Sequence, residues 1–243
     1  MSTALVLAAG RATRLGPLRD RWAKACVPVA GVSPLAFLLP RLAAAGVRRA
    51  WVNLHYRAEQ VREEARRHAP PGLELRFLEE EVLLGTGGSL LAVAEAEARA
   101  PELVVNAKVY TDFDFAGLLA DPRPALVLHP ASPLDEFGGL AHADGLVCGL
   151  RPRGDGPSAE QAAVFTGIAR PDPAWLAHLE AAAPVDGLRC SVRHGLLPAL
   201  AAGHAPRAVL HRGWWQEISS PERVEAAAAE LRGRGLAREA AEA

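Results

Sequence analysis

The chain has 243 residues, 50% of them hydrophobic and 23% charged, a composition typical of a globular protein with a sizeable core. Its net charge of −1 gives no overall basic field, so we expect no nucleic-acid partner. Its three cysteines are far apart and lack C-x-x-C spacing, which favours reduced thiols over a disulfide or metal framework. No basic segment precedes the first apolar run, so we expect a cytoplasmic protein without signal peptide or membrane partner.

The first half of the chain alternates short apolar runs with helical patterns. Runs of buried-strand length occur at Ala4–Leu7, Ala50–Asn53, Leu73–Leu78, Leu103–Asn106 and Ala125–Leu128. Helices are predicted between them, at Pro34–Ala45, Ala58–His68, Gly88–Ala98 and Phe115–Leu119. This repetition predicts an α/β fold, a three-layer α/β/α Rossmann-like arrangement around a mostly parallel mixed sheet.

The second half is less regular. The stretch from Pro130 to Pro157 is rich in glycine and alternates in polarity like a hairpin, which predicts antiparallel strands or a small subdomain. The remaining predicted elements are a strand at Val164–Ala169, helices at Pro173–Ala182 and Ser191–Ala202, a strand at Ala208–Leu210, and a last helix from Pro221 after the candidate caps Ser219 and Ser220. We predict a single domain over residues 1–233 and a frayed tail over 234–243.

A glycine loop follows the first strand. Leu7-Ala-Ala-Gly10-Arg-Ala-Thr-Arg14 places small residues at the carboxyl end of a strand, where ligands of open α/β sheets bind. Backbone N–H groups there can approach a phosphate, and Arg11 and Arg14 can donate to it. Taken alone, the segment could equally be an ordinary turn with surface arginines. It matches neither the dinucleotide motif G-x-G-x-x-G nor the P-loop.

Lysine is rare in this chain. Lys24 and Lys108 are its only lysines, and every other basic residue apart from the histidines is arginine. Lys24 follows the glycine loop, and Lys108 follows the fourth predicted strand. Both positions are therefore candidates for handling phosphate.

Further motifs extend along nearly the whole chain. They are Val27-Pro-Val-Ala-Gly31, Gly85-Thr-Gly-Gly-Ser-Leu90, Val104-Val-Asn106, Tyr110-Thr-Asp-Phe-Asp-Phe115, Phe165-Thr-Gly-Ile168 and Trp214-Trp-Gln-Glu-Ile-Ser-Ser-Pro-Glu-Arg223. With the glycine loop and Lys24, they resemble the sugar-1-phosphate nucleotidyltransferases, whose pattern is roughly L-A-A-G-x-G-T-R-L-x-P-L, then P-K and P-V-x-G. Within this family the chain resembles the short bacterial members acting on N-acetylmuramate 1-phosphate or mannose 1-phosphate.

The resemblance implies a Rossmann-like nucleotidyltransferase that binds a nucleoside triphosphate and a sugar 1-phosphate and releases pyrophosphate. It implies Arg14 and Lys24 as catalytic residues, with Thr166 and Gly167 lining the sugar pocket. Lys108, which departs from the family pattern, is a third catalytic candidate. The implied nucleotide-binding residues are Ala8, Gly10, Thr13, Arg14, Gly85, Thr86, Gly87 and Asn106. The glycines from Gly85 to Gly88 have an alternative role in helix entry. A homodimer or a partner enzyme is compatible with the sequence.

The resemblance also implies Mg²⁺, but the chain departs from the family pattern at the metal ligands. Lys108 replaces the aspartate of N-G-D, and Glu217 replaces the aspartate of W-x-D-[VI]-G-T-P-E. An ammonium repels a cation by about 4 kcal/mol per unit-charge pair at about 4 Å and an effective dielectric of about 20. Two milder departures are Ala12 for the second loop glycine and Ala23 for the proline before Lys24.

Several interpretations of Lys108 remain open. Its ammonium could replace the ion, or the pocket could have left catalysis and bind a nucleotide in a regulatory role. Alternatively, Lys108 points away and Asp112 or Asp114 holds the metal, with Glu217 as a second candidate ligand. Lys108 could also be a solvated lysine without a role, and the two aspartates could be turn and helix-cap residues. The preserved triphosphate motifs favour the enzyme over the binding protein.

Overall fold

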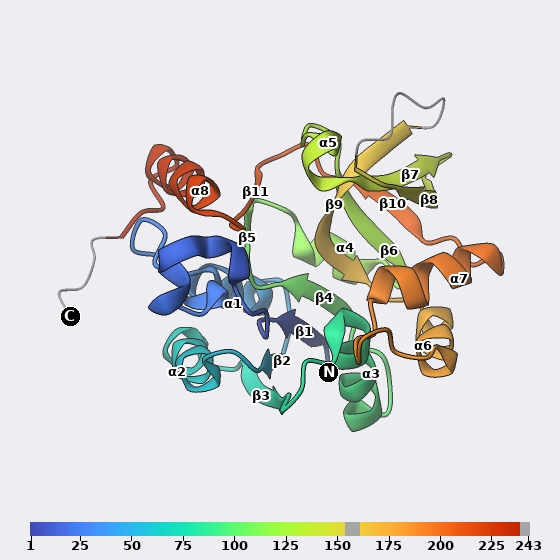
Figure 1. Ribbon diagram of the computed structural model, residues 1–243, viewed down its shortest axis with the longest axis horizontal. Coiled ribbons are helices and arrows are strands. Elements are labelled where there is room, and N and C mark those ends of the chain that lie inside the picture. The colour runs from blue at the N-terminus through green and yellow to red at the C-terminus, as the bar shows by residue number, and fades with distance from the viewer. Residues whose placement is uncertain (154–160, 239–243) are drawn as a thin grey trace. The chain divides into compact units, whose positions relative to one another are not determined.

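The computed structural model describes residues 1–153 and 161–238 (Figure 1). They form two compact units, each assembled from segments distant in sequence. Unit 1 contains residues 1–82, 106–116 and 214 onward, and unit 2 contains residues 83–105 and 117–213. The single domain over 1–233 stays a prediction. The end of the predicted hairpin region and the last residues of the tail lie outside the described residues.

Three parallel strands form the sheet of unit 1. They are β1 (Thr3–Leu7), β2 (Arg49–Leu54) and β3 (Glu74–Glu79), in the order β3-β2-β1 (Figure 1). Helices α1 (Pro34–Ala44) and α2 (Ala58–His68) follow β1 and β2 along the chain. Ser33 caps α1 by accepting a 3.0 Å hydrogen bond from Ala36 N. Since parallel strands share a direction, the residues that follow β1 and β2 lie at one edge of this sheet.

Unit 1 also contains a two-stranded ribbon that the sequence did not indicate. The short strands β5 (Val109–Thr111) and β11 (Trp215–Glu217) pair antiparallel, and α8 (Pro221–Gly233) follows β11. Tyr110 in β5 is fully buried and donates a 2.7 Å hydrogen bond to Val32 O. Two 3₁₀ segments, η1 (Thr13–Asp20) and η2 (Lys24–Cys26), complete this unit.

Unit 2 contains mixed strand pairings. Its strands are β4 (Leu103–Asn106, whose last residue belongs to unit 1), β6 (Ala125–His129), β7 (Gly139–Ala143), β8 (Leu146–Arg151), β9 (Gln161–Arg170) and β10 (Arg207–Leu210). β6 and β10 are parallel, whereas β9 runs antiparallel to β4, β6 and β7. The β7–β8 hairpin confirms the hairpin predicted in this region.

The helices of unit 2 follow the predictions with local differences. They are α3 (Gly85–Glu97), α4 (Phe115–Ala120, which begins in unit 1), α5 (Leu134–Phe137), α6 (Pro173–Ala181) and α7 (Leu197–Ala201). The single helix predicted over Ser191–Ala202 is instead a π segment, η3 (Ser191–Leu196), followed by α7. Pro198, at the start of α7, lacks the N–H that a continuous helix would use there.

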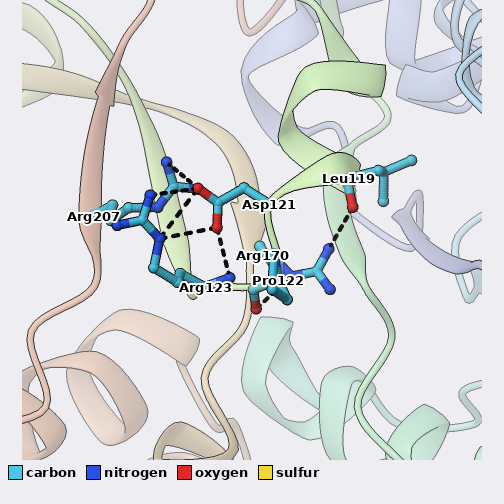
Figure 2. A network of polar contacts seen from close by, with 6 residues as sticks. All are labelled: Leu119, Asp121, Pro122, Arg123, Arg170 and Arg207. Carbon is cyan, nitrogen blue, oxygen red and sulfur yellow. Dashed lines mark hydrogen bonds and ion pairs between the residues drawn. The ribbon is translucent and has the colours of Figure 1, made fainter.

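An arginine network holds the end of α4 in unit 2. Asp121 lies between Arg123 and Arg207, at 2.6 Å from Arg123 Nη2 and 3.3 Å from Arg207 Nη1 (Figure 2). Hydrogen bonds from Arg123, with the charge of Arg207, hold the pKa of Asp121 well below its usual range. Arg170 donates to the carbonyls of Pro122 and Leu119, at 3.0 and 3.4 Å. Arg170 of β9 thus satisfies carbonyls at the helix end, and Arg207 of β10 pairs with the Asp121 side chain that follows it.

The cysteines and the length of the helices can be compared with the expectations from the sequence. Cys26, Cys148 and Cys190 form no disulfide bond among the described residues. Burial raises the pKa of the Cys26 thiol well above its usual value, so this cysteine is unreactive as a nucleophile. Within the described ranges, every helix is too short or too polar to cross a membrane.

Candidate functional site

A buried asparagine shapes the glycine loop after β1. Asn53, at the end of β2, accepts hydrogen bonds from Ala8 N at 2.5 Å and Ala9 N at 3.1 Å. Its Nδ2 donates to Glu80 Oε1 at 2.9 Å, and both side chains are buried. The N–H of Ala8, a predicted nucleotide contact, is therefore engaged by Asn53. Sequence reasoning missed this support, although a polar residue ending a buried strand was the available signal.

The rest of the glycine loop is accessible. Gly10 is exposed, and a Cβ added to it would meet no atom of the described chain within 4 Å. Thr13 and Arg14 begin η1 and are also exposed. Ala12 is buried with φ of 55°, a left-handed conformation that costs a non-glycine residue about 1 kcal/mol. The loop keeps the backbone shape of its missing glycine and leaves Gly10, Thr13 and Arg14 open to a ligand.

Residues at the start of α2 fix the segment that leads to Lys24. Tyr56 donates a 2.9 Å hydrogen bond to Arg19 O. Gln60 accepts one from Ala23 N at 2.5 Å and donates one to Arg21 O at 3.0 Å. Because these contacts hold the residues just before η2, the segment presents Lys24 from a defined backbone position.

Lys108 lies in the turn before β5, facing the end of β11. Its N–H donates to Asn106 O at 2.8 Å, and its carbonyl accepts from Ile218 N at 2.9 Å. Its Nζ lies 2.8 Å from Glu217 Oε2. The ribbon register, which pairs Glu217 with Val109, brings together these two residues 109 positions apart in sequence. Two positions predicted from the family's metal site are therefore adjacent, joined as an ion pair.

The second oxygen of Glu217 is also engaged. Ser219 Oγ donates to Glu217 Oε1, and Arg223 Nη1 in the first turn of α8 lies 3.3 Å from it. The Glu217 side chain is only 3% exposed. Burial acts to raise the pKa of Glu217, but Lys108, Ser219 and Arg223 outweigh it and hold this pKa below its usual value. Glu217 is therefore a carboxylate, and each of its oxygens is engaged by donors of this chain.

Lys24 and Arg14 add positive charge to the same region of unit 1. Burial, then the charges of Lys108 and Arg14, lower the pKa of Lys24 to about 8, against an opposing contribution from Glu217. Neither the Lys24 nor the Arg14 side chain has a hydrogen-bond or ion-pair partner among the described residues. We call Arg14, Lys24, Lys108 and Arg223 the cationic cluster. Arg223 was not predicted as a site residue, although it ends a recognised motif.

These residues do not fit Mg²⁺. Both oxygens of Glu217 contact donors, and the ammonium of Lys108 occupies the position facing it. Asp112 follows β5, at the other end of the ribbon from Lys108, and accepts a 2.7 Å hydrogen bond from Trp214 N. The structure does not bring Asp112 beside Glu217. Nowhere in residues 1–153 and 161–238 do three His, Cys, Asp or Glu side chains gather to hold a metal.

The second glycine motif begins α3 in unit 2. A Cβ on Gly85 would lie 2.5 Å from Arg189 O, and one on Gly87 would lie 2.5 Å from Leu179 Cδ2. Gly87 N donates a 2.7 Å hydrogen bond to Arg189 O, and Thr86 Oγ1 accepts one from Ser191 N at 3.0 Å. Close approach of the backbone at residue 189 therefore explains why glycine occupies positions 85 and 87.

Gly85→Ala is expected to lower the free energy of unfolding by about 2 kcal/mol more than Gly203→Ala, because only the first adds a backbone clash. Both glycines have positive φ, 76° and 87°, but a Cβ on Gly203 meets nothing within 4 Å. Denaturant titration of the two variants measures the difference. Equal losses would contradict the packing explanation for Gly85.

The predicted sugar residues lie at an irregularity of β9. The register between β6 and β9 shifts between Leu126 and Leu128, and Gly167 has φ of 81°. Thr166 is buried and donates a 2.8 Å hydrogen bond to Val127 O. Such bulges re-aim side chains and recur next to active sites. Thr166 and Gly167 stay predictions as sugar contacts.

The comparisons with known proteins agree with the motifs. A sequence model of the family described as "Nucleotidyl transferase" matches residues 3–125, just over half of the chain. The mannose-1-phosphate guanylyltransferase of Mycobacterium tuberculosis is 35% identical over 116 residues, which cover 48% of this chain and 32% of the relative. The N-acetylmuramate alpha-1-phosphate uridylyltransferase of Caulobacter vibrioides is 39% identical over 106 residues, covering 42% and 44%. The chain thus spans about a third to a half of the length of these curated relatives.

Solved structures with the same fold cover nearly all of the chain. HddC from Yersinia pseudotuberculosis has a TM-score of 0.74 at 20% identity, covering 95% of this chain and 100% of its own. UDP-glucose pyrophosphorylase from Acinetobacter baumanii has a TM-score of 0.76 at 14% identity, covering 95% and 93%. At such low identity these likenesses show the fold alone, and they confirm the predicted α/β nucleotidyltransferase fold with a mixed sheet. The resemblance to sugar-1-phosphate nucleotidyltransferases is confirmed as well, and the chain belongs to the nucleotidyl transferase family.

Proposed function

We propose that the protein binds a nucleoside triphosphate and transfers its nucleotidyl group to a sugar 1-phosphate, releasing pyrophosphate. The observation that carries the proposal is the cationic cluster beside an accessible glycine loop in unit 1. The names of two curated relatives, a guanylyltransferase and a uridylyltransferase for sugar 1-phosphates, support the reaction class. The fold alone would not support a reaction class, because one fold can serve many functions.

The reaction needs positioning and charge neutralisation more than a covalent nucleophile. An oxygen of the sugar phosphate attacks the α-phosphorus, a new P–O bond forms, and the bond to pyrophosphate breaks. Arg14 and the backbone at Gly10 would bind the phosphates, together with Thr13. Lys24 would neutralise the charge between the two reactants, because its ammonium is half-buried and has no partner among the described residues.

The remaining predicted contacts complete this proposal. Asn106 would help bind the nucleotide from the turn that carries Lys108. Gly85, Thr86 and Gly87 would contact base and ribose, and Thr166 and Gly167 the sugar. Thr86 reaches a ligand only by exchanging or sharing its bonds with Ser191.

Pyrophosphate release tests the proposal. We would assay the common nucleoside triphosphates against a panel of sugar 1-phosphates, with Mg²⁺ and with a chelator. Lys24→Ala is expected to lower the rate of pyrophosphate release about 100-fold, the effect that loss of one preorganised electrostatic group has in other enzymes. Arg66→Ala, an exposed charge on α2, is the control and should leave the rate unchanged. Nucleotide binding without release in any combination would contradict the transferase and favour a nucleotide-binding regulatory protein.

A further inference from the structure

Positive charge exceeds negative charge in the cationic cluster. Three of its four side chains, Lys24, Lys108 and Arg223, share the negative charge of Glu217, and Arg14 adds a further positive charge beside Lys24. Both oxygens of Glu217 already accept from donors of this chain. A region with this balance attracts a polyanion and repels a free divalent cation.

The Lys108 ammonium is held in place yet accessible. Hydrogen bonds at 2.8 and 2.9 Å fix its backbone on both sides, and its Nζ lies 2.8 Å from Glu217 Oε2. An ammonium has three donors, and the pair with Glu217 uses one of them. The side chain is 31% exposed, so its other donors can reach a ligand. Glu217 therefore orients Lys108 without covering it.

Lys24 provides a second, independent indication of what this region is built for. Its ammonium is half-buried, close enough to Lys108 and Arg14 for their charges to act on it, and lacks an ion-pair partner among the described residues. Gathering like charges in this way is unfavourable unless a ligand of opposite charge compensates them. The accessible Gly10, in the loop that leads to Arg14, suits the compact, multiply charged phosphates of a nucleotide.

We propose that Lys108, oriented by Glu217, is a built-in cation that binds nucleotide phosphates directly, so that the protein prefers a metal-free nucleoside triphosphate to its magnesium complex. This inference rests on the proposed function, since it assumes a triphosphate at the glycine loop. Bound Mg²⁺ removes two of the ligand's negative charges and brings a divalent cation toward Lys108. Both effects weaken binding of the magnesium complex at this site.

Titration calorimetry of the wild-type protein with ATP, GTP and UTP tests the preference. For the triphosphate that binds, we expect affinity in a chelator to be about tenfold or more tighter than in excess Mg²⁺. Binding that requires Mg²⁺ would overturn this inference and leave the proposed function intact. Absence of binding in both conditions would contradict the proposed function, and the inference with it.

Variants at one position locate the effect. Lys108→Met is expected to weaken metal-free binding about tenfold, the value of one charge-assisted hydrogen bond, whereas Lys108→Arg should stay within about threefold of wild type. Arg66→Met is the control for loss of a distant surface charge. Lys108→Asp, which adds a carboxylate beside Glu217, should reverse the preference toward the magnesium complex. If Lys108→Met folds and its affinity for metal-free triphosphate is unchanged, the proposed role of Lys108 is overturned. If this variant does not fold, the comparison of wild-type affinity in chelator and in excess Mg²⁺ still decides whether the protein prefers the metal-free nucleotide.

Discussion

Glu217→Gln is expected to lower the free energy of unfolding by about 3 kcal/mol, because it removes the charge that two neighbouring cations share. Glu217 is 3% exposed and lies 2.8 Å from Lys108 Nζ and 3.3 Å from Arg223 Nη1. Glutamine has nearly the same shape and can still accept a hydrogen bond from Ser219. The loss therefore reports on charge more than on packing, and denaturant unfolding at neutral pH measures it.

Glu230→Gln is the matched control for this substitution. Glu230 pairs with Arg234 at 3.2 Å on α8, but its side chain is 48% exposed. Exposed pairs contribute about 0 to 1 kcal/mol, so this variant should be nearly as stable as wild type. Similar losses at positions 217 and 230 would show that Glu217 does not stabilise the ribbon as the buried contacts indicate.

Glu217→Gln is also expected to bind metal-free triphosphate more tightly than wild type. Removing the negative charge leaves Lys24, Lys108 and Arg223 without their common counter-charge, which a polyphosphate then supplies. Bound nucleotide should therefore recover part of the lost stability. A carboxylate that held a metal for the nucleotide would behave in the opposite way, and its amide variant would bind more weakly. The sign of the affinity change separates the two roles of Glu217.

The elements that depend on local sequence were predictable. The apolar runs located β1, β2, β3, β4 and β6 to within a residue at most ends, and α2 has the predicted bounds. Each is a short apolar strand or an amphipathic helix whose pattern appears within one short window. The π segment at Ser191 was not predictable, because its pattern is that of an ordinary helix.

The ribbon that builds the candidate site was not predictable from local patterns. β5 and β11 have three residues each, and each acquires its strand conformation from a partner about 100 positions away. Sequence comparison identified Lys108 and Glu217 as the altered positions. It could not show that their side chains meet, since this depends on the ribbon register. Of the interpretations open for Lys108, the ion pair favours an ordered cation over a solvated lysine.

The two glycine motifs show that glycine can occupy a position for different structural reasons. Both motifs suggest phosphate or nucleotide contacts by sequence. In the structure, Gly10 faces open space, whereas Gly85 and Gly87 lie against the chain at Arg189. The close packing of Gly85 and Gly87 against Arg189 could not be predicted from the sequence, because it joins segments about 100 residues apart.

Triphosphate affinity is expected to fall about tenfold between pH 7 and pH 9, because Lys24 must be protonated to bind an anion. Burial and the charges of Lys108 and Arg14 lower the pKa of Lys24 to about 8, so at pH 9 only about a tenth of the unliganded protein carries this charge. A bound polyphosphate holds the proton, which links affinity to pH. Calorimetry in a chelator across this range measures the change.

Lys24→Arg is the control, because arginine stays charged throughout this pH range. Any change in the protonation of the nucleotide itself affects both proteins equally. The affinity of Lys24→Arg should lack the tenfold loss. In the unliganded wild type, stability should instead rise as pH increases from about 8 toward the ordinary lysine pKa near 10.5, since the unfolded chain then binds more protons than the folded one. Parallel pH profiles for wild type and Lys24→Arg would mean that the Lys24 ammonium does not contact the bound phosphates, and the cationic cluster would then act through Lys108 and the arginines.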